Sequence, residues 1–484
     1  MTIITLGEDI TPYYSDPMQE KLTIMHNEGD DYTNDTACGD KLIKLHKDLQ
    51  RLDFPYYFVE IITTNADIER ELVVLQKLYS TEDTHIKYIV TNGLFKKNIY
   101  NGDTKCILPF IHKYINPQGL VMPCCVGNEN FPIGNLNHHD LKDISTLDIR
   151  NTMLRGERPD ACSTCWQKED MGLESLRINV NRHWKKYKNQ KNFILRHLDI
   201  RLSNKCNLRC RMCSGKFSNR IAQEELEIYG FTKYKNEILD EKLKQKVLKY
   251  IEDNIETIES VNFAGGEPLI NKEHYDILDI LIKHNKTNVR LRYSTNFSIL
   301  KFKNYDILSY WKKFKKVNLG ASIDSIGKQS NYVRNGVEYS VFEKNYNQIK
   351  NLKNIDFQIY STLHLCNILN LPDLQKRWLA LGLPCNKLNF DLLVNPEEQS
   401  ITVLPIKFKK LAEEKILSHI KFLEDFSDST SIIDEWKNVI KFMNNKDNSK
   451  FLKKFFQLTD DKDKFRNQKF EDYFPEYKDL RNYT

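Results

Sequence analysis

Three cysteines stand close together in the stretch CNLRCRMC: Cys206, Cys210 and Cys213. Thiolates are the ligands that select zinc or iron–sulfur clusters. A structural zinc ion takes four ligands, commonly as C-x2-C pairs. Three thiolates with the spacing C-x3-C-x2-C instead suit a 4Fe–4S cluster in which one iron stays open to a substrate or cofactor. The motif therefore predicts a cluster that takes part in chemistry.

A second group of cysteines lies upstream, between residues 101 and 190. Its members are Cys106, Cys124, Cys125, Cys162 and Cys165. This segment is rich in turn residues and poor in apolar periodicity, so it needs a metal site to hold it together. Four thiolates suffice for one fully coordinated 4Fe–4S cluster, and they also suit a structural zinc ion. Cys124 and Cys125 are alternatives for the second ligand.

The elements that must position the three-cysteine motif lie between residues 191 and 400. Short apolar runs alternate there with helical patterns, which predicts strands joined by helical crossovers. The candidate strands are HLDIRLS, ESVNFAG, VRLRYST, KVNLGASID, DFQIYSTLH and KLNFDLLV. Such a pattern predicts a parallel sheet covered by helices, either open or barrel-like. Chemistry gathers at the C-terminal ends of the strands in these folds, and the motif follows the first strand.

The two ends of the chain carry no catalytic motif. Residues 1–100 predict a small α/β domain of unknown role, with strands within 54–64 and 85–93 and a helix over 66–79. Residues 401–484 predict a charged helical extension that packs across the barrel. The predicted order is therefore an N-terminal α/β domain, the segment 101–190, the barrel 191–400 and this extension.

Composition excludes several classes of protein. The 484 residues carry a net charge of +6, a small excess for this length, so nucleic acid is an unlikely partner. The lysines Lys312, Lys313, Lys315 and Lys316 are expected to be solvated surface. No run reaches the ~18 apolar residues of a membrane helix, and the N-terminus lacks the features of a signal peptide. We therefore expect a cytoplasmic, membrane-free protein.

The cysteine count fits a reducing compartment. Eleven cysteines in a cytoplasmic chain point to metal binding or catalysis rather than to a disulfide framework. Three of them, Cys38, Cys366 and Cys385, stand apart from both groups and are expected to be small buried side chains.

The three-cysteine motif resembles the signature of the radical S-adenosylmethionine (radical SAM) superfamily, C-x3-C-x-aromatic-C, with Met212 in the place of the aromatic residue. The turn after the second predicted strand is similar to the family's GGEP motif, whose backbone groups meet the amino end of SAM. Its residues here are Gly265, Gly266, Glu267 and Pro268. The resemblance implies a partial (β/α)6 barrel that binds SAM on a 4Fe–4S cluster.

Polar side chains at the ends of the later strands complete the SAM site that the resemblance implies. These candidates are Asn296, Ser322, Asp324, Arg334 and Asn367. Short polar side chains suit the ribose hydroxyls, and Arg334 suits a carboxylate. Ser, Asp and Asn also cap helices that follow strands, which is the competing explanation for each of them.

The upstream cysteines are similar to the auxiliary-cluster segment of SPASM and twitch domains, which opens with C-x(9–15)-G-x4-C. Here Cys106, Gly119 and Cys124 supply that spacing. The resemblance favours one auxiliary 4Fe–4S cluster, bound by Cys106, Cys124, Cys162 and Cys165. The segment precedes the barrel, whereas in the family it usually follows it. Over residues 104–400 the chain thus resembles twitch domain-containing radical SAM proteins.

The resemblance implies an enzyme that reductively cleaves SAM to a 5′-deoxyadenosyl radical, which then removes a hydrogen atom from a substrate. The electron would come from a donor such as flavodoxin or ferredoxin. The favoured substrate is a peptide or protein side chain that is oxidised or cross-linked. A small molecule, such as a sugar or nucleoside, is the first alternative. A non-catalytic zinc or iron–sulfur binding protein is the second.

Overall fold

The computed structural model describes residues 2–5, 21–25, 58–63, 87–92, 104–170, 174–201, 203–234 and 240–484. The chain forms two compact units, residues 1–103 and 104–484. Each unit is described by itself below.

The first unit contains a four-stranded sheet in the order β1-β2-β3-β4, with every neighbouring pair parallel. Its strands are β1 (Thr2–Thr5), β2 (Lys21–Met25), β3 (Phe58–Thr63) and β4 (Lys87–Asn92). The sequence predicted β3 and β4 but missed β1 and β2, because such short apolar runs carry little periodicity. The predicted helix 66–79 and Cys38 lie outside the described residues.

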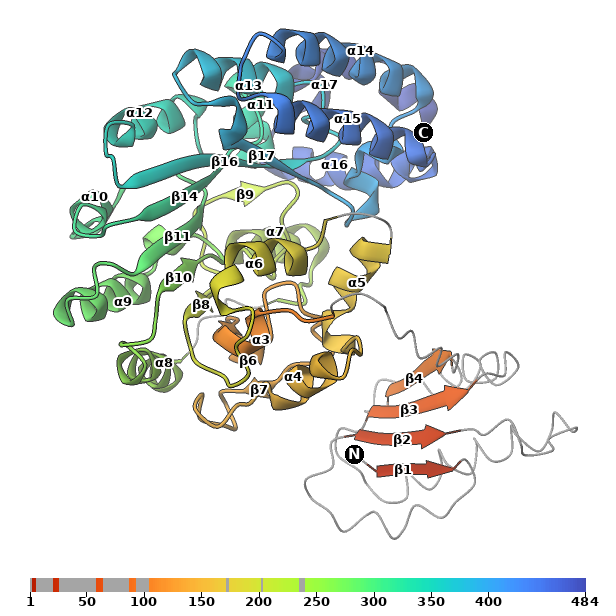
Figure 1. The fold of residues 1–484 in the computed structure, drawn as a ribbon. Helices are drawn as coiled ribbons and strands as arrows, with labels where there is room; N and C mark the ends of the chain where they lie inside the picture. Colours follow the sequence, from red (N-terminus) through yellow and green to blue (C-terminus); the bar gives the residue numbers. More distant parts are fainter. Residues whose placement is uncertain are drawn as a thin grey trace, which may run out of the picture. The chain divides into compact units, whose positions relative to one another are not determined.

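The second unit is built on a nine-stranded sheet in the order β17-β16-β14-β11-β10-β8-β5-β6-β7 (Figure 1). Its strands are β5 (His112–Ile115), β6 (Leu120–Met122), β7 (Gly134–Asn135), β8 (His197–Ile200), β10 (Ser260–Phe263), β11 (Arg290–Thr295), β14 (Val317–Ser322), β16 (Ile355–Leu363) and β17 (Leu388–Leu392). From β8 to β17 every pair is parallel, so the six predicted strands and their parallel order are confirmed.

Helices connect these parallel strands, and several of them lie along the outer side of the sheet (Figure 1). They are α7 (Asn219–Tyr229), α8 (Glu241–Asp253), α9 (Lys272–Lys283), α10 (Ile307–Trp311), α11 (Gly327–Val333), α12 (Tyr339–Ile349) and α13 (Leu371–Ala380). Local sequence explains their limits. The Asp240 side chain accepts a hydrogen bond from the Leu243 amide and so caps the start of α8. Helix α7 ends where Gly230 takes a left-handed conformation.

The two faces of the sheet differ in polarity. On β11, Leu291, Tyr293 and Thr295 are buried toward the helices, while Arg292 and Ser294 on the alternate face remain partly or fully exposed. The strands of a parallel sheet that is covered on both faces are instead nearly all apolar. The inner face of this sheet is therefore open to polar groups, as expected of a partial barrel.

The segment that carries the upstream cysteines extends the same sheet. Strand β5 pairs in parallel with β8, and the short strands β6 and β7 add to it in antiparallel order. Its helices are α3 (Leu108–Ile111), α4 (Leu147–Leu154), α5 (Ser163–Asp170) and α6 (Leu176–His183). Because β5 adds to the first barrel strand, a segment that precedes the barrel in sequence becomes its neighbour in space.

The C-terminal extension covers the β17 edge of the sheet. It comprises α14 (Ile406–Leu423), α15 (Thr430–Asn445), α16 (Leu452–Arg466) and α17 (Phe470–Tyr473). The buried ring of Trp436 lies 4.8 Å from that of Phe390 on β17, measured between centroids. The Tyr477 hydroxyl donates to the Leu365 carbonyl at 2.9 Å. The predicted helices of this region are thus present, and they pack against the barrel.

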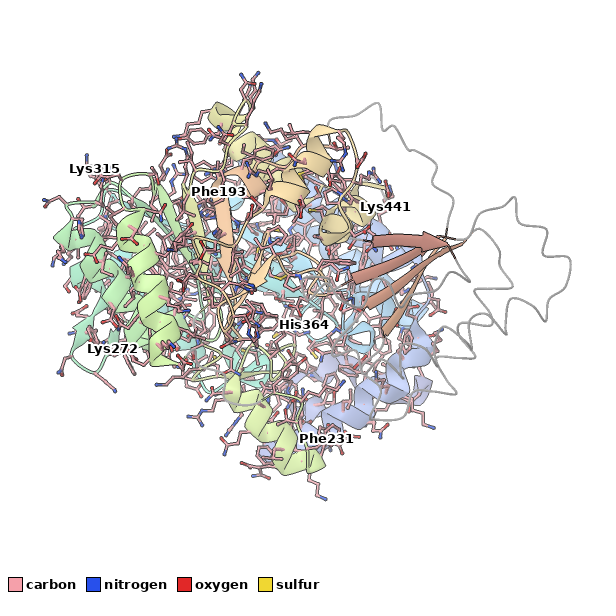
Figure 2. All side chains as sticks on the ribbon, turned by 90° about the horizontal axis from the view of Figure 1, so that it is seen from below. Phe193, Phe231, Lys272, Lys315, His364 and Lys441 are labelled. Atoms are coloured by element: carbon pink, nitrogen blue, oxygen red, sulfur yellow. The ribbon has the colours of Figure 1, made fainter. Side chains whose placement is uncertain are left out.

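The remaining surface features agree with the sequence. Lys312, Lys313, Lys315 and Lys316 are all exposed, and Figure 2 shows Lys315 at the periphery. In the part of the chain that the structure describes, no helix combines the length and apolar character needed to cross a bilayer.

Candidate functional site

The three-cysteine motif forms a loop directly after β8, which we call the cluster loop (residues 206–213). Its backbone is fixed at both ends. The Cys206 amide donates to the Asn219 side chain at 2.9 Å, at the start of α7. Near the other end, β9 (Arg209–Cys210) pairs antiparallel with β15 (Arg334–Asn335), so that Cys210 lies opposite Arg334. Both ends of the loop are thus held by contacts with neighbouring elements.

Hydrogen-bond donors point at the sulfur atoms of this loop. An Arg334 guanidinium nitrogen lies 3.6 Å from Cys210 Sγ, and the Leu208 amide lies 3.5 Å from Cys206 Sγ. The side-chain amide nitrogen of Asn296 lies 3.9 Å from Cys206 Sγ. Such donors stabilise thiolate ligands and tune the cluster that they hold. This donor set therefore fits an iron–sulfur cluster.

Burial opposes ionisation of the thiols in the metal-free protein. Burial, followed by the neighbouring Cys210, raises the pKa of Cys206 to about 12. Burial also raises the pKa of Cys210, and the nearby Arg334 guanidinium partly offsets this effect. Metal binding must therefore displace the thiol protons, which links cluster assembly to pH.

The GGEP turn lies directly against the cluster loop. Gly266 has φ +52°, and a Cβ placed there would lie 2.2 Å from the Lys205 carbonyl oxygen. The Glu267 amide donates to that same carbonyl at 2.8 Å. Glycine is thus required here because the turn packs against Lys205, the residue that precedes the cluster loop.

Glu267 joins the ends of two strands. Its fully buried carboxylate accepts hydrogen bonds from the Thr295 hydroxyl at 2.7 Å, the Asn296 backbone amide at 2.6 Å and the Leu269 backbone amide at 3.0 Å. Burial raises the pKa of Glu267 to about 7, although these three bonds oppose the shift. The side chain is aimed at the end of β11, and it orients Asn296 toward Cys206.

The strand-end residues fall into two groups. Asp324 is fully buried, and its carboxylate lies 2.6 Å from Arg334 Nε and accepts from the Thr362 amide at 2.8 Å. Asp324 and Arg334 thus lie together beside Cys210. The Asn367 amide group donates to the carbonyls of Asp324 and Thr362, at 3.0 and 2.9 Å.

Asn367 and Ser322, the other two predicted contacts, differ in their burial. The Asn367 side-chain oxygen accepts from the His364 amide at 2.8 Å, so this fully buried side chain is engaged with backbone groups. Ser322 ends β14 and is half-buried. The contacts of Asn367 describe a residue that fixes the turn after β16. A contact between SAM and either residue stays a prediction.

The upstream cysteines meet in a small buried cluster of side chains. Its members are Cys106, Leu108, Cys124, Met153, Cys162 and Trp166. Cys165 interacts electrostatically with Cys106 and Cys162 and so belongs to the same group. Cys125 lies outside this cluster: burial, followed by the nearby Asp199 carboxylate of β8, raises the pKa of its thiol to about 12. The geometry therefore favours Cys124 over Cys125 as the fourth member of the set.

In the described part of the chain, neither cysteine group is arranged to bind a single metal ion. Among the described residues, no three His, Cys, Asp or Glu side chains converge as tightly as one metal ion requires. A 4Fe–4S cluster needs a wider arrangement of ligands, because each thiolate binds a different iron.

A cavity of about 540 Å³ opens on the polar face of the sheet. Ser294 of β11 and Tyr360 of β16 line it, together with Asn389 and Asp391 of β17. Helices α6 and α15 contribute Asn179 and the pair Glu435 and Asn438. The upstream segment, the barrel and the C-terminal extension thus all border this space.

The sequence interpretation missed several buried polar residues of this region. Arg211, inside the cluster loop, is buried against Asp463 of α16. His364, labelled in Figure 2 among the interior side chains, has an Nε2 without a hydrogen-bond partner among the described residues. Burial lowers the pKa of His364 to about 4. A charged residue within the cysteine motif was a usable signal for Arg211, but no local signal marked Asp463 or His364.

Comparison with known proteins agrees with this geometry. The sequence model of the radical SAM superfamily matches residues 200–374, and that of the SPASM iron–sulfur cluster-binding domain matches residues 106–166. The chain is 23% identical over 220 residues to an uncharacterized protein of Methanocaldococcus jannaschii, a match that covers 44% of this chain and 67% of the relative.

Two solved structures are similar at lower identity. Native anSMEcpe with bound AdoMet is 18% identical with a TM-score of 0.32, over 47% of this chain and 59% of the other. Streptococcus suis SuiB bound to precursor peptide SuiA is 14% identical with a TM-score of 0.33, over 65% of this chain and 70% of the other. The chain thus spans less than two thirds of the anSMEcpe chain.

The two matched domains carry the two cysteine groups. Residues 200–374 contain the cluster loop and the GGEP turn, and residues 106–166 contain the upstream cysteines. These domains imply a SAM-binding 4Fe–4S cluster, auxiliary iron–sulfur binding, and SAM itself as the cofactor. These two matches support a radical SAM superfamily protein of the SPASM/twitch type.

Proposed function

We propose that this protein is a radical SAM enzyme that oxidises or cross-links a side chain of a peptide or protein. The observation that carries the proposal is the cavity on the polar face of the sheet. Its side-chain amides, Asn179, Asn389 and Asn438, offer both donors and acceptors, and so match the N–H and C=O groups of a peptide backbone.

The cluster loop supplies three thiolates for the catalytic 4Fe–4S cluster, namely Cys206, Cys210 and Cys213. When bound there, SAM and the cluster supply a 5′-deoxyadenosyl radical that takes a hydrogen atom from the substrate. The protein's part is to position these groups and to exclude water. The GGEP turn (Gly265, Gly266, Glu267 and Pro268) fixes the edge of the site against the loop.

The other predicted SAM contacts keep their roles as part of the proposal. Arg334 donates toward Cys210 and forms an ion pair with Asp324, so it orients the cluster loop. Its guanidinium is also the proposed partner of a carboxylate group. Asn296 faces Cys206. Ser322 lies on the polar face of the sheet at the end of β14, where ribose hydroxyls would be bound. Asn367 shapes the turn that follows β16.

The upstream cysteines bind one auxiliary 4Fe–4S cluster through Cys106, Cys124, Cys162 and Cys165. Their shared burial supports this set, and the contact of Cys125 with Asp199 supports its exclusion. A fully ligated cluster has no open iron for a substrate, so electron transfer is the role that suits it.

A small-molecule substrate is the second candidate. A cavity of about 540 Å³ lies in the range of small-ligand sites, and its polar lining also suits a sugar or nucleoside. The same chemistry would then act on a different compound.

The first experiment is anaerobic reconstitution with iron and sulfide, followed by SAM and dithionite, with 5′-deoxyadenosine measured by mass spectrometry. Cys210→Ala is the control. Production that depends on Cys210 supports the radical SAM reaction. Its absence in a protein with an intact cluster and every tested substrate present contradicts the proposal.

The second experiment separates the substrate classes. The enzyme is co-expressed with short peptides encoded beside its gene, and the peptides are examined by mass spectrometry for loss of hydrogen. A loss that needs Cys210 favours the peptide. Unchanged peptides, together with 5′-deoxyadenosine formation stimulated by a sugar or nucleoside, favour the small molecule.

A further inference from the structure

We propose that helix α16 of the C-terminal extension is part of the SAM-cluster site, and that Asp463 is a positioning residue that holds the cluster loop through Arg211. The inference rests on the proposed role of Cys206, Cys210 and Cys213 as cluster ligands. It gives the C-terminal extension a function, because the extension then sets the geometry of a loop that lies about 250 residues earlier in the chain.

Arg211 is anchored on the barrel side by α11. It lies between Cys210 and Cys213 and is only 5% exposed. Its backbone amide donates to the Val333 carbonyl at 2.8 Å, and its Nε donates to the Tyr332 carbonyl at 2.9 Å. The guanidinium also lies 3.5 Å from the centroid of the Tyr332 ring. The side chain therefore points away from the cluster and into the protein.

Asp463 of α16 completes the surroundings of this guanidinium. Its carboxylate accepts a hydrogen bond from Arg211 and another from the Tyr332 hydroxyl, the latter at 2.9 Å. Asn467 then takes a left-handed conformation with φ +51°, which ends α16 and turns the chain back. As a result, the Gln468 side-chain oxygen accepts from the same guanidinium at 2.9 Å.

A second buried ion pair fixes α16 to the other side of the cluster loop. Arg466 forms two hydrogen bonds of 2.8 Å with Glu224 of α7, the helix that follows the loop. The two side chains are 2% and 1% exposed. Two further side chains, Gln399 and Lys462, donate to the Arg211 carbonyl at 3.1 and 3.4 Å. Both the side chain and the backbone of Arg211 are thus held from outside the barrel.

These contacts should affect the cluster itself as well as the stability of the fold. A buried ion pair is often no more stabilising than an apolar contact, but removal of one partner leaves an uncompensated buried charge. Here that charge would lie within the cluster loop. Charge and hydrogen bonds near an iron–sulfur cluster also set its reduction potential. Loss of Asp463 should therefore change both the mobility of the loop and the electronic properties of the cluster.

The test compares Asp463→Asn with Asp460→Asn. Asp460 lies on the same helix and pairs with the partly exposed Arg481, with no contact to the cluster loop among the described interactions. In metal-free reduced protein, we measure the alkylation rates of Cys206, Cys210 and Cys213 by mass spectrometry. We expect Asp463→Asn to raise these rates about tenfold through local opening, and Asp460→Asn to leave them unchanged.

The second readout is the reconstituted cluster. Asp463→Asn removes a negative charge beside Arg211, so the midpoint potential should rise, and the electron paramagnetic resonance spectrum of the reduced cluster with SAM should change. Arg211→Lys keeps the charge but loses the planar fork, so it should raise the alkylation rates while moving the potential less. Gln468→Ala, a neutral change, serves if Asp463→Asn fails to fold, and should raise the rates about threefold.

Wild-type alkylation rates together with an unchanged spectrum and potential in the folded Asp463→Asn protein would overturn the proposal. Equal effects of Asp460→Asn would overturn it as well, since they would show a general loss of stability. Alkylation is measured without metal, whereas 5′-deoxyadenosine formation tests the proposed function, so the two proposals can fail separately.

Discussion

The cluster loop and the upstream cysteines differ in how their thiols are brought together. The cluster loop places three thiols in one short stretch, and its backbone is paired with β15 and held by α7 and α16. The upstream thiols come from positions up to about sixty residues apart, and they form much of their own small core. One site is held mainly by contacts with the surrounding barrel, while in the other the cysteines share a small core with Leu108, Met153 and Trp166.

The difference teaches how each site should depend on metal. The cluster loop is fixed by hydrogen bonds and a buried ion pair with elements outside the motif. The upstream core is small, with Leu108, Met153 and Trp166 as its other buried side chains, so we expect the free energy of metal binding to contribute to its folding. The predictions below test this contrast, from the largest expected effect to the smallest.

Cys210→Ala should abolish SAM cleavage while the barrel stays folded. The substitution removes one of the three proposed cluster ligands, but β15 and α16 still hold the loop. The measurements are 5′-deoxyadenosine formation, iron content and far-ultraviolet circular dichroism. Roughly half of the iron should remain, in the auxiliary cluster. SAM cleavage at the wild-type rate would show that the ligand assignment is wrong.

Cys162→Ala should loosen the upstream segment while the barrel remains intact. Loss of one proposed ligand should remove metal-coupled folding energy from a small core. Limited proteolysis of the reconstituted protein should show cuts between residues 104 and 190 about tenfold faster than in wild type. Cys385→Ala, which alters a buried cysteine outside both groups, is the matched control. Equal protection in both variants would contradict the contrast.

Gly266→Ala should damage the cluster loop, because the new Cβ would lie 2.2 Å from the Lys205 carbonyl at a φ of +52°. Gly382 also has a positive φ, +88°, but its Cβ would meet open space. Gly382→Ala should therefore cost about 1 kcal/mol of unfolding free energy and leave SAM cleavage unchanged. Gly266→Ala should cost more and reduce SAM cleavage strongly. Equal losses in denaturant titration and SAM cleavage would rule out the steric explanation.

Glu435→Gln should have the smallest effect, which should develop between pH 4.5 and 7 and stay constant above that range. Burial, and then Asp391, raise the pKa of Glu435 to about 7 in the folded protein from an ordinary value of 4.5. Its stabilising contribution is therefore complete below pH 4.5 and is lost as the pH rises through 7. The uncharged glutamine avoids that loss, so the variant should gain about 1 kcal/mol above pH 7.

The check is denaturant unfolding of both proteins across this pH range. Asp434→Asn, an exposed change at the adjacent position of α15, should show no such pH-dependent difference from wild type. A gain for Glu435→Gln that is the same at every pH would mean that its carboxylate is not responsible.

The sequence alone determined the local features of the protein. The spacing of Cys206, Cys210 and Cys213, the GGEP turn and the alternation of strands with helices all arise from short stretches of chain. These stretches carry their own signal, because cysteine spacing and hydrophobic periodicity are fixed by local geometry. The parallel sheet and the position of the cluster loop after its first strand followed from them.

Tertiary structure decided which residues meet across long separations. Cys124 and Cys125 are adjacent and chemically identical, and only packing turns one toward Cys106 and the other toward Asp199. Asn367 is a predicted SAM contact, and only the fold reveals that its side chain bonds to the carbonyls of Asp324 and Thr362. The pairing of Arg211 with Asp463 joins positions 252 residues apart. No local pattern encodes such a contact, because it forms only when the C-terminal helices pack against the barrel.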